Sequence, residues 1–128
     1  MKNASSCLYL FRSTSIKRDV FVEIKTRFKL WLETENGYVF GEGLLQLLSK
    51  VQERGTLRGA AEDLGMSYRH AWGKIKTAER RFGKPILKTH KGGTSGGGGA
   101  ELTEEGIMLL NKYLEIKKTL TQVSDRIK

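Results

Sequence analysis

The fold of this chain is decided by residues 55–76, which read GTLRGAAEDLGMSYRHAWGKIK. The first half repeats small and apolar residues at positions i, i+3, i+4 and i+7, the spacing of one buried helix face. These residues are Leu57, Ala60, Ala61 and Leu64. Thr56 can cap this helix through its hydroxyl, Gly65 can end it, and Ser67 can cap a second helix. The stretch therefore predicts two short helices joined by a tight turn.

We expect the second helix to run from about Ser67 to Phe82, because Gly83 and Pro85 would stop it. Its apolar side chains share one face: Tyr68, Ala71, Trp72, Ile75, Ala78 and Phe82. We therefore expect Tyr68 and Trp72 in the core rather than stacked on bases. The opposite face and its flanks are polar or basic: Arg69, His70, Gly73, Lys74, Lys76, Thr77, Arg80 and Arg81. This arrangement is typical of a helix-turn-helix.

The segments on the N-terminal side add a hairpin and a further helix. Residues 20–41 alternate apolar and polar side chains around Asn36-Gly37, a strong hairpin signal, so we expect strands over about Lys25–Thr34 and Tyr38–Gly41. Residues 43–54 have the apolar spacing of a helix. Residues 1–18 are rich in serine and lack periodicity, which predicts a disordered extension.

A glycine-rich stretch follows the second helix of the pair. Six of the 15 glycines lie in residues 92–99, between two short runs with strand character. Such a stretch is either a flexible linker or the tip of a β-hairpin, and the sequence leaves both open. As a hairpin it would be the wing of a winged helix-turn-helix. Its flank and tip would then carry Lys88, His90, Lys91, Thr94 and Ser95.

Thr103 can cap a final helix from about Glu104 to Arg126. Its apolar stripe has heptad-like spacing: Leu109, Tyr113, Ile116, Leu120, Val123 and Ile127. The first half is expected to pack on the domain, and the second half would be exposed in a monomer. We therefore predict a homodimer formed through this helix.

Together these elements predict a mainly α chain with a small amount of β structure. It would be a winged helix-turn-helix with an N-terminal hairpin and a long C-terminal dimerisation helix. The expected organisation is a disordered extension over residues 1–18, a DNA-binding domain over residues 19–103 and the dimerisation helix over residues 104–128.

The charge of the chain is concentrated. The 128 residues contain 23 Lys+Arg against 14 Asp+Glu, for a net charge of +9. Residues 66–91 hold eight basic residues and one acidic residue, Glu79, so 26 residues carry +7. A concentrated charge indicates a face for an anionic partner, and nucleic acid is favoured over an acidic membrane surface or protein. On charge alone, a solvated basic helix fits equally well.

The predicted motif assigns roles to these basic residues. In a helix-turn-helix, the N-terminal part of the second helix contacts base edges in the major groove of double-stranded DNA. We expect Arg69 to make a bidentate guanine contact, with Ser67 and His70 beside it. Phosphate contacts are expected from Lys74, Lys76 and Arg81. The wing would contact phosphates or the minor groove.

Other features argue against different classes of protein. A single cysteine, Cys7, excludes an intramolecular disulfide, and two histidines provide no zinc-ligand set. No apolar run approaches the roughly 20 residues that a membrane span needs. The apolar run Leu8–Phe11 is too short for the core of a signal peptide. We therefore expect a cytoplasmic protein with no metal, no cofactor and no catalytic residue.

Two stretches carry a resemblance to a known family. The first is the opening stretch with its core Met-Ser-Tyr-Arg-His-Ala-Trp at residues 66–72, and the second is residues 87–106, LKTHKGGTSGGGGAELTEEG. Both resemble the N-terminal domain of ModE-type molybdate-responsive regulators, whose DNA-binding part is similar to that of LysR-type regulators. The hairpin residues FKLWLE at 28–33 resemble the short, single-domain members. The resemblance covers about residues 25–113, and the two main motifs are specific in combination.

The resemblance implies a winged helix-turn-helix regulator that dimerises on an inverted-repeat operator. It places recognition on Ser67, Tyr68, Arg69, His70 and Lys74, with wing contacts over residues 91–99. It also implies control of genes for molybdate transport or molybdenum metabolism. The sequence ends at Lys128, before the molybdate-binding domains of the longer members would begin, so direct molybdate binding is not expected.

Three other functions stay open as hypotheses. Non-specific, nucleoid-type DNA binding would use the same basic stretch. An enzyme with a phosphate-binding glycine loop is disfavoured, because the Walker pattern Gly-x4-Gly-Lys-Ser/Thr is absent. A pure interaction module would act through the final helix alone.

Overall fold

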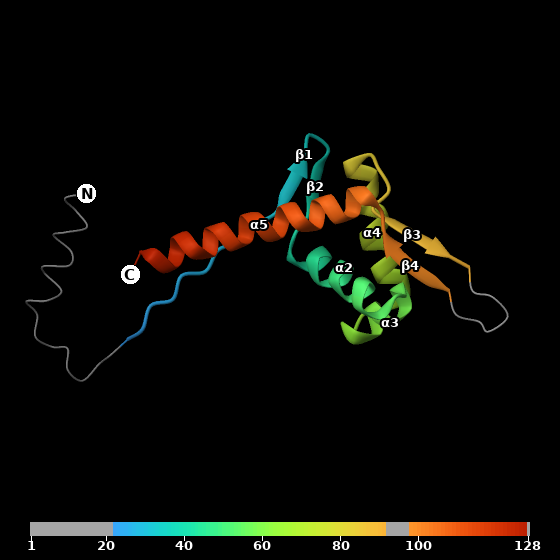
Figure 1. The fold of residues 1–128 in the computed structure, drawn as a ribbon, viewed down its shortest axis with the longest axis horizontal. Helices are drawn as coiled ribbons and strands as arrows, with labels where there is room; N and C mark the ends of the chain where they lie inside the picture. Colours follow the sequence, from blue (N-terminus) through green and yellow to red (C-terminus); the bar gives the residue numbers. More distant parts are fainter. Residues whose placement is uncertain (1–21, 92–97, 128) are drawn as a thin grey trace, which may run out of the picture.

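The structure is a computed structural model that describes residues 22–91 and 98–127. In chain order its elements are β1 (Leu32–Thr34), β2 (Gly37–Phe40), α2 (Glu42–Arg54), α3 (Leu57–Asp63), α4 (Tyr68–Phe82), β3 (Leu87–His90), β4 (Gly99–Leu102) and α5 (Glu104–Arg126). The predicted extension over residues 1–18 and the wing residues Thr94 and Ser95 lie outside the described residues. Figure 1 shows α2, α3 and α4 packed together near one end of α5, with the β3–β4 hairpin at the same end.

The helix pair α3–α4 forms as the opening stretch predicts. The Thr56 hydroxyl accepts a hydrogen bond from the Gly59 amide at 2.9 Å, and the Ser67 hydroxyl accepts one from the His70 amide at 3.0 Å. Both caps satisfy amides that a helix start leaves without a partner. Gly65 lies between the helices at φ 68°, a conformation that favours glycine. Thr56 therefore fixes where α3 begins, and Gly65 and Ser67 fix the turn at which α3 ends and α4 begins.

The strands on either side of the glycine-rich stretch pair with each other, so the hairpin alternative is confirmed over the linker. Strands β3 and β4 pair antiparallel, from Leu87 opposite Leu102 to His90 opposite Gly99. The amide of Ala100 also donates to the carbonyl of Gly55 at 2.8 Å, which ties β4 to the start of the helix pair. The predicted wing is thus present and is joined to the body beside α3.

Helix α5 begins on the body and then leaves it. The Thr103 hydroxyl accepts a hydrogen bond from the Gly106 amide at 3.0 Å, as the sequence predicts. Gly106 packs so closely on the Ile86 carbonyl that a Cβ atom there would overlap it. Beyond this anchored start, α5 extends away from the body in the direction opposite to the wing (Figure 1).

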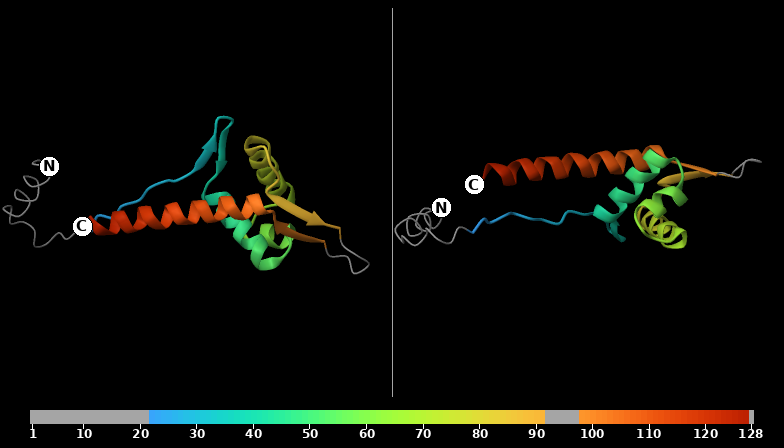
Figure 2. Two further views of the ribbon diagram at one scale, coloured as in Figure 1. Left: turned by 45° about the horizontal axis from the view of Figure 1, so that its top comes forward. Right: turned by 90° about the horizontal axis from the view of Figure 1, so that it is seen from below.

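The N-terminal hairpin is shorter than predicted. The first strand was expected from Lys25, but β1 comprises only Leu32–Thr34, and residues 22–31 are extended without pairing to a strand. The reason lies in β2, which ends at Phe40 because α2 begins at Glu42, so no residues remain to pair with the earlier part of the first strand. We call residues 22–31 the N-terminal arm. The arm extends toward the same end of the molecule as α5 (Figures 1 and 2).

One hydrophobic core joins the helices, both hairpins and the first half of α5. Its largest fully buried side chains are Phe40, Leu47, Leu48, Val51, Ile75, Ile86 and Tyr113. Phe40 and Tyr113 pack with their ring centroids 5.2 Å apart. The core therefore includes Tyr113 and also Leu109, both buried within one chain. Their burial confirms that the first half of α5 packs on the domain, and it corrects the predicted dimer stripe by removing Leu109 and Tyr113 from it.

Tyr68 is a second correction. It was expected in the core, but 41% of it is exposed, while Trp72 is half-buried. Tyr68 lies in the first turn of α4, where its ring stacks on Trp72 with a centroid distance of 6.3 Å instead of entering the core. The Arg58 guanidinium of α3 covers the Tyr68 ring at 5.1 Å. The apolar face of α4 thus starts at Ala71.

Candidate nucleic-acid interface

The outer face of α4 presents the side chains that the sequence assigns to recognition. Ser67, Tyr68, Arg69 and His70 are exposed at the start of the helix. Ala71, Ile75 and Ala78 hold the opposite face in the core. A buried stripe fixes the helix in place, so the exposed residues keep a defined direction relative to the wing.

A basic groove runs between α4 and β2. Its volume is about 520 Å³, and its lining residues are Tyr38, Val39, Leu44, Arg69, His70, Gly73, Lys74, Thr77, Ala78 and Arg81. Three of these are basic, and none of these lining residues is acidic. An anion in this groove would therefore meet positive groups without a carboxylate to repel it. The structure thus brings together Arg69, His70, Lys74 and Arg81 from the predicted set.

Arg81 also has a structural role that the sequence did not reveal. Its guanidinium donates to the Tyr38 carbonyl at 3.0 Å, while its own carbonyl accepts from the Thr34 hydroxyl at 2.9 Å. These bonds join the end of α4 to the β1–β2 hairpin. Arg81 therefore holds one wall of the groove as well as contributing charge to it.

A second row of side chains crosses α3 and α4 along a different flank. Its order is Arg58, Tyr68, Trp72 and Lys76, with the Lys76 ammonium 4.6 Å from the centre of the Trp72 ring. Lys76 also pairs with Glu79 at 3.2 Å. Two cations thus bracket two stacked rings, an arrangement that aromatic faces stabilise. Sequence reasoning missed Arg58, although it is a basic residue on the exposed side of the first helix.

Glu79 is the one acid within the basic stretch, and it anchors the wing. Its Oε2 atom accepts hydrogen bonds from the amides of Ile86 at 2.7 Å and Leu87 at 3.1 Å. Burial alone would raise the pKa of Glu79, but these two amides and the Lys76 ammonium together lower it below its ordinary value. A carboxylate is therefore fixed at the start of β3. The sequence showed Glu79 only as an exception in the charge pattern, with no sign of its partners.

The wing side chains differ in how freely they can reach a ligand. Lys88, His90 and Lys91 are all exposed. The ring of His90 lies 2.9 Å from Glu101 across the hairpin, and this contact is the main cause of the lowered pKa of Glu101. His90 is thus held against β4, whereas Lys88 and Lys91 flank it on exposed positions.

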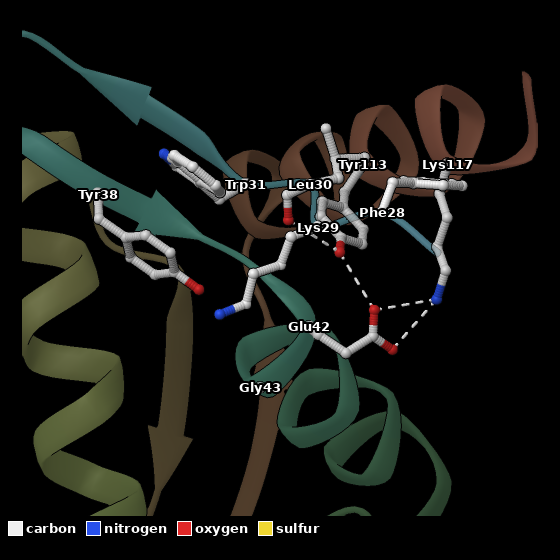
Figure 3. Close-up of a pocket in the computed structure, with 9 residues that line it drawn as sticks. All are labelled: Phe28, Lys29, Leu30, Trp31, Tyr38, Glu42, Gly43, Tyr113 and Lys117. Carbon is white, nitrogen blue, oxygen red and sulfur yellow. Dashed lines mark hydrogen bonds and ion pairs between the residues drawn. The ribbon is translucent and has the colours of Figure 1, made fainter. Parts of the chain in front are cut away.

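A larger hollow lies on another part of the surface, between the N-terminal arm, α2 and α5. It has a volume of about 730 Å³, and Figure 3 shows Phe28, Trp31 and Tyr38 among its lining residues. At one side Lys117 donates to Glu42 at 2.9 Å, and the Tyr113 hydroxyl lies 3.1 Å from the same carboxylate. Burial, followed by this carboxylate, raises the pKa of Tyr113 to about 12. This cluster holds α5 against α2.

Residues 22–91 and 98–127 contain no group of three His, Cys, Asp or Glu side chains that could hold a metal ion. None of the helices in these ranges combines the length and apolar character that crossing a membrane requires.

Several curated proteins are similar to this chain in amino-acid sequence. The molybdenum-pterin-binding protein MopA of Rhodobacter capsulatus is 33% identical over 82 residues, which are 64% of this chain and 31% of MopA. The molybdenum transport protein ModE of Azotobacter vinelandii is 29% identical over 108 residues, 80% of this chain and 40% of that protein. The transcriptional regulator ModE of Haemophilus influenzae is 28% identical over 94 residues, 73% of this chain and 36% of that protein.

These relatives confirm the resemblance to ModE-type regulators that the two sequence motifs indicate. The chain spans about a third of the length of MopA and two fifths of the length of the Azotobacter ModE. The family described as bacterial regulatory helix-turn-helix protein, lysR family, matches residues 43–107. The match extends from α2 through the helix pair and both wing strands to the start of α5, which is half of the sequence. The chain therefore belongs to the LysR family of bacterial regulatory helix-turn-helix proteins.

Proposed function

We propose that this chain is a sequence-specific DNA-binding transcriptional regulator that acts as a homodimer on an inverted-repeat operator. The observation that carries the proposal is the outer face of α4, where Arg69 and Lys74 line a groove without an acidic residue. Family membership supports DNA as the anionic partner. The fold supports the orientation, because the caps and the buried stripe leave only one face of α4 available to a major groove.

Within this proposal the residues divide by role. Arg69 reads a guanine, because its guanidinium fork matches two acceptors on that base and it lies exposed in the first turn of α4. Ser67, Tyr68 and His70 lie beside it. Phosphates are contacted by Lys74, Lys76 and Arg81 of α4 and by Lys88 and Lys91 of the wing. Because Lys76 and Arg81 are also bound to Glu79 and to the Tyr38 carbonyl, we expect smaller contributions from these two.

The dimer is assigned to the distal half of α5. Leu120, Val123 and Ile127 are exposed there by 39%, 41% and 75%, and Ile116 is half-buried. These positions continue the heptad-like stripe beyond the body, where no other described element covers them. Pairing two α5 helices would bury the stripe and place two α4 helices on successive major grooves.

The relatives' names support a regulatory context. They connect two relatives with molybdenum transport or molybdenum-pterin binding and a third with transcriptional regulation. We propose that the operator lies in front of genes for molybdate transport or molybdenum metabolism. The proposal assigns no molybdate site to this chain.

The test of base reading is a substitution series on DNA selected from a random pool. Arg69→Ala should lower the ratio of affinities for selected and random duplexes by about 10-fold to 100-fold, because one bidentate base contact contributes about 1–3 kcal/mol. Lys91→Ala should weaken both duplexes about equally, since phosphate contacts carry no sequence information. Lys118→Ala, which removes the same charge from an exposed position on α5, is the matched control. An unchanged ratio in Arg69→Ala would refute the assignment of base reading.

A further inference from the structure

The N-terminal arm has the sequence of a strand, but within residues 22–91 and 98–127 no element covers its first residues. Its apolar side chains alternate with charged ones from Val22 onward, which is the pattern of a half-buried strand. Yet Val22 is 70% exposed, Ile24 89% and Phe28 45%. Apolar side chains gathered at such exposure mark an interaction surface. The alternating apolar side chains, from which a longer first strand was predicted, are therefore exposed and available to a covering surface.

The distal half of α5 also exposes apolar side chains, and it lies at the same end of the molecule as the arm. Its stripe of Leu120, Val123 and Ile127 is exposed, and the arm and α5 extend in the same direction from the body (Figure 2). The helix nevertheless leaves Val22 and Ile24 of its own chain uncovered. At the root of the arm, the 730 Å³ hollow opens between Phe28, Trp31 and Tyr113 and continues the apolar surface toward the body (Figure 3).

A second copy of the chain can cover the two exposed apolar surfaces, because it carries the same two surfaces. A two-fold interface is self-complementary, so the arm of each copy can lie beside the paired α5 helices and cover the part of the other copy's stripe that the helix pair leaves exposed, and this contact is made twice. Each chain contributes six exposed apolar side chains to such an interface, which are Val22, Ile24 and Phe28 of the arm and Leu120, Val123 and Ile127 of the α5 stripe.

The lengths of the two segments agree with this arrangement. From Tyr113 to Ile127, α5 rises by about 21 Å, at about 1.5 Å per residue. The arm of residues 22–31 spans about 30 Å, at about 3.3 Å per residue, so it can cover the whole projecting part of a helix. If two α5 helices pair antiparallel about Leu120, Ile127 of one copy lies level with Tyr113 of the other. The end of one helix then reaches the hollow of the other copy.

We propose that the N-terminal arm docks on α5 of a second copy of this chain and that the last turn of this helix fills the hollow at the arm's root. Val22, Ile24 and Phe28 make the apolar contact, and the charged side chains of the arm face water. This inference rests on the proposed dimer, to which it adds a second contact surface and a role for the unpaired strand pattern. The two arms hold the two DNA-binding domains of the dimer at a fixed distance from each other.

The first test is a matched pair of variants analysed by sedimentation equilibrium. Val22→Ser with Ile24→Ser should raise the dissociation constant of the dimer tenfold or more, because four apolar side chains per dimer lose their contacts. Glu23→Ser with Lys25→Ser changes the alternate positions of the same segment and leaves the net charge unchanged, so this control should leave the dimer intact. Equal dissociation constants for both double variants would overturn the proposal.

The second test identifies the surface that the arm touches. A benzophenone amino acid replaces Ile24, and isotopically heavy and light chains are mixed before irradiation. Cross-links should join heavy to light chains and should map to α5. Cross-links confined to one chain, or mapping to other elements, would contradict the docking.

A third variant separates this inference from the proposed dimer. Leu120→Arg should produce a monomer if α5 forms the dimer. If Leu120→Arg is monomeric while Val22→Ser with Ile24→Ser is not weakened, the arm proposal fails and the dimer stands. A wild-type chain that is monomeric at every concentration would overturn both.

Discussion

Two helical glycines show how one residue type meets opposite surroundings. Gly73 lies on the exposed face of α4, and a Cβ atom built there would meet no other atom within 4 Å. Gly106 lies at the start of α5, where a Cβ atom would overlap the backbone carbonyl of Ile86. The protein itself therefore requires a glycine at residue 106 and does not require one at residue 73.

This contrast predicts opposite changes in stability. Gly73→Ala should raise the free energy of unfolding by about 0.5–1 kcal/mol, because alanine loses less backbone entropy in a helix. Gly106→Ala should lower it by about 1–3 kcal/mol, because the carbonyl of Ile86 cannot move without shifting β3. Urea unfolding of both variants measures the effects. A loss of stability in Gly73→Ala would contradict the open space around residue 73.

Tyr113 carries a prediction at alkaline pH. Burial and the Glu42 carboxylate raise its pKa from 10.0 to about 12, so its ionisation should appear as a late step in an absorbance titration. The folded pKa is above the unfolded one, so the associated stability is present below pH 10 and is lost as the pH rises toward 12. Tyr113→Phe should remove the late titration and cost about 1 kcal/mol at neutral pH through its lost hydrogen bond. If the late step persists in this variant, another tyrosine is responsible.

At the scale of elements, helix ends were more predictable than strand lengths. The caps Thr56, Ser67 and Thr103 act within three residues of their partners, so the sequence contains all the information that sets these boundaries. The first strand depended on how many residues its partner could offer. The number of residues available in β2 is limited by the start of α2 at Glu42. The alternation in residues 25–31 contains no information about that limit.

The sequence predicted the direction of side chains in the candidate site but not their contacts with other elements. Helical periodicity placed Arg69 and His70 outward correctly and put Lys74 on the same side, where it is half-buried and lines the groove, because outward direction follows from the buried stripe of the same helix. It could not show that Arg81 binds the Tyr38 carbonyl or that Arg58 covers Tyr68, since these contacts join different elements. It placed Tyr68 in the core because a helix projection ignores where the neighbouring helix ends.

The stability of the wing should depend on Glu79, which binds amides at the start of β3. Glu79→Gln should lower the stability of the β3–β4 hairpin by on the order of 1 kcal/mol at neutral pH, because a carboxylate accepts its two amides more strongly than an amide oxygen does. The folded pKa of Glu79 is lowered, so its contribution is present above the ordinary value of 4.5 and is lost as the pH falls through the folded value.

Hydrogen exchange of the β3 and β4 amides measures this effect. The wild type and Glu79→Gln should differ at neutral pH and converge in acid. Glu115→Gln, at an exposed position of α5, is the control and should leave the wing unchanged. A difference between wild type and Glu79→Gln that grows in acid would contradict the lowered pKa.

At the scale of the whole molecule, the face proposed to read DNA lies apart from the surfaces proposed to form the dimer. The basic groove and the wing lie near one end, and the distal part of α5 and the N-terminal arm extend toward the other (Figures 1 and 2). Residues 66–91 carry +7, so binding to DNA should release counterions and weaken steeply as salt rises. Lys88→Ala and Lys91→Ala should each reduce the slope of log affinity against log salt by about 1, as expected for one phosphate contact.

The most direct measurement is the affinity of the wild-type chain for its selected duplex and for a random duplex of equal length, in competition at one salt concentration. Sequence-specific reading by α4 predicts a ratio of about 10³ or more. A ratio near one would show that the basic face binds DNA without reading it, and the protein would then be a non-specific DNA-binding protein.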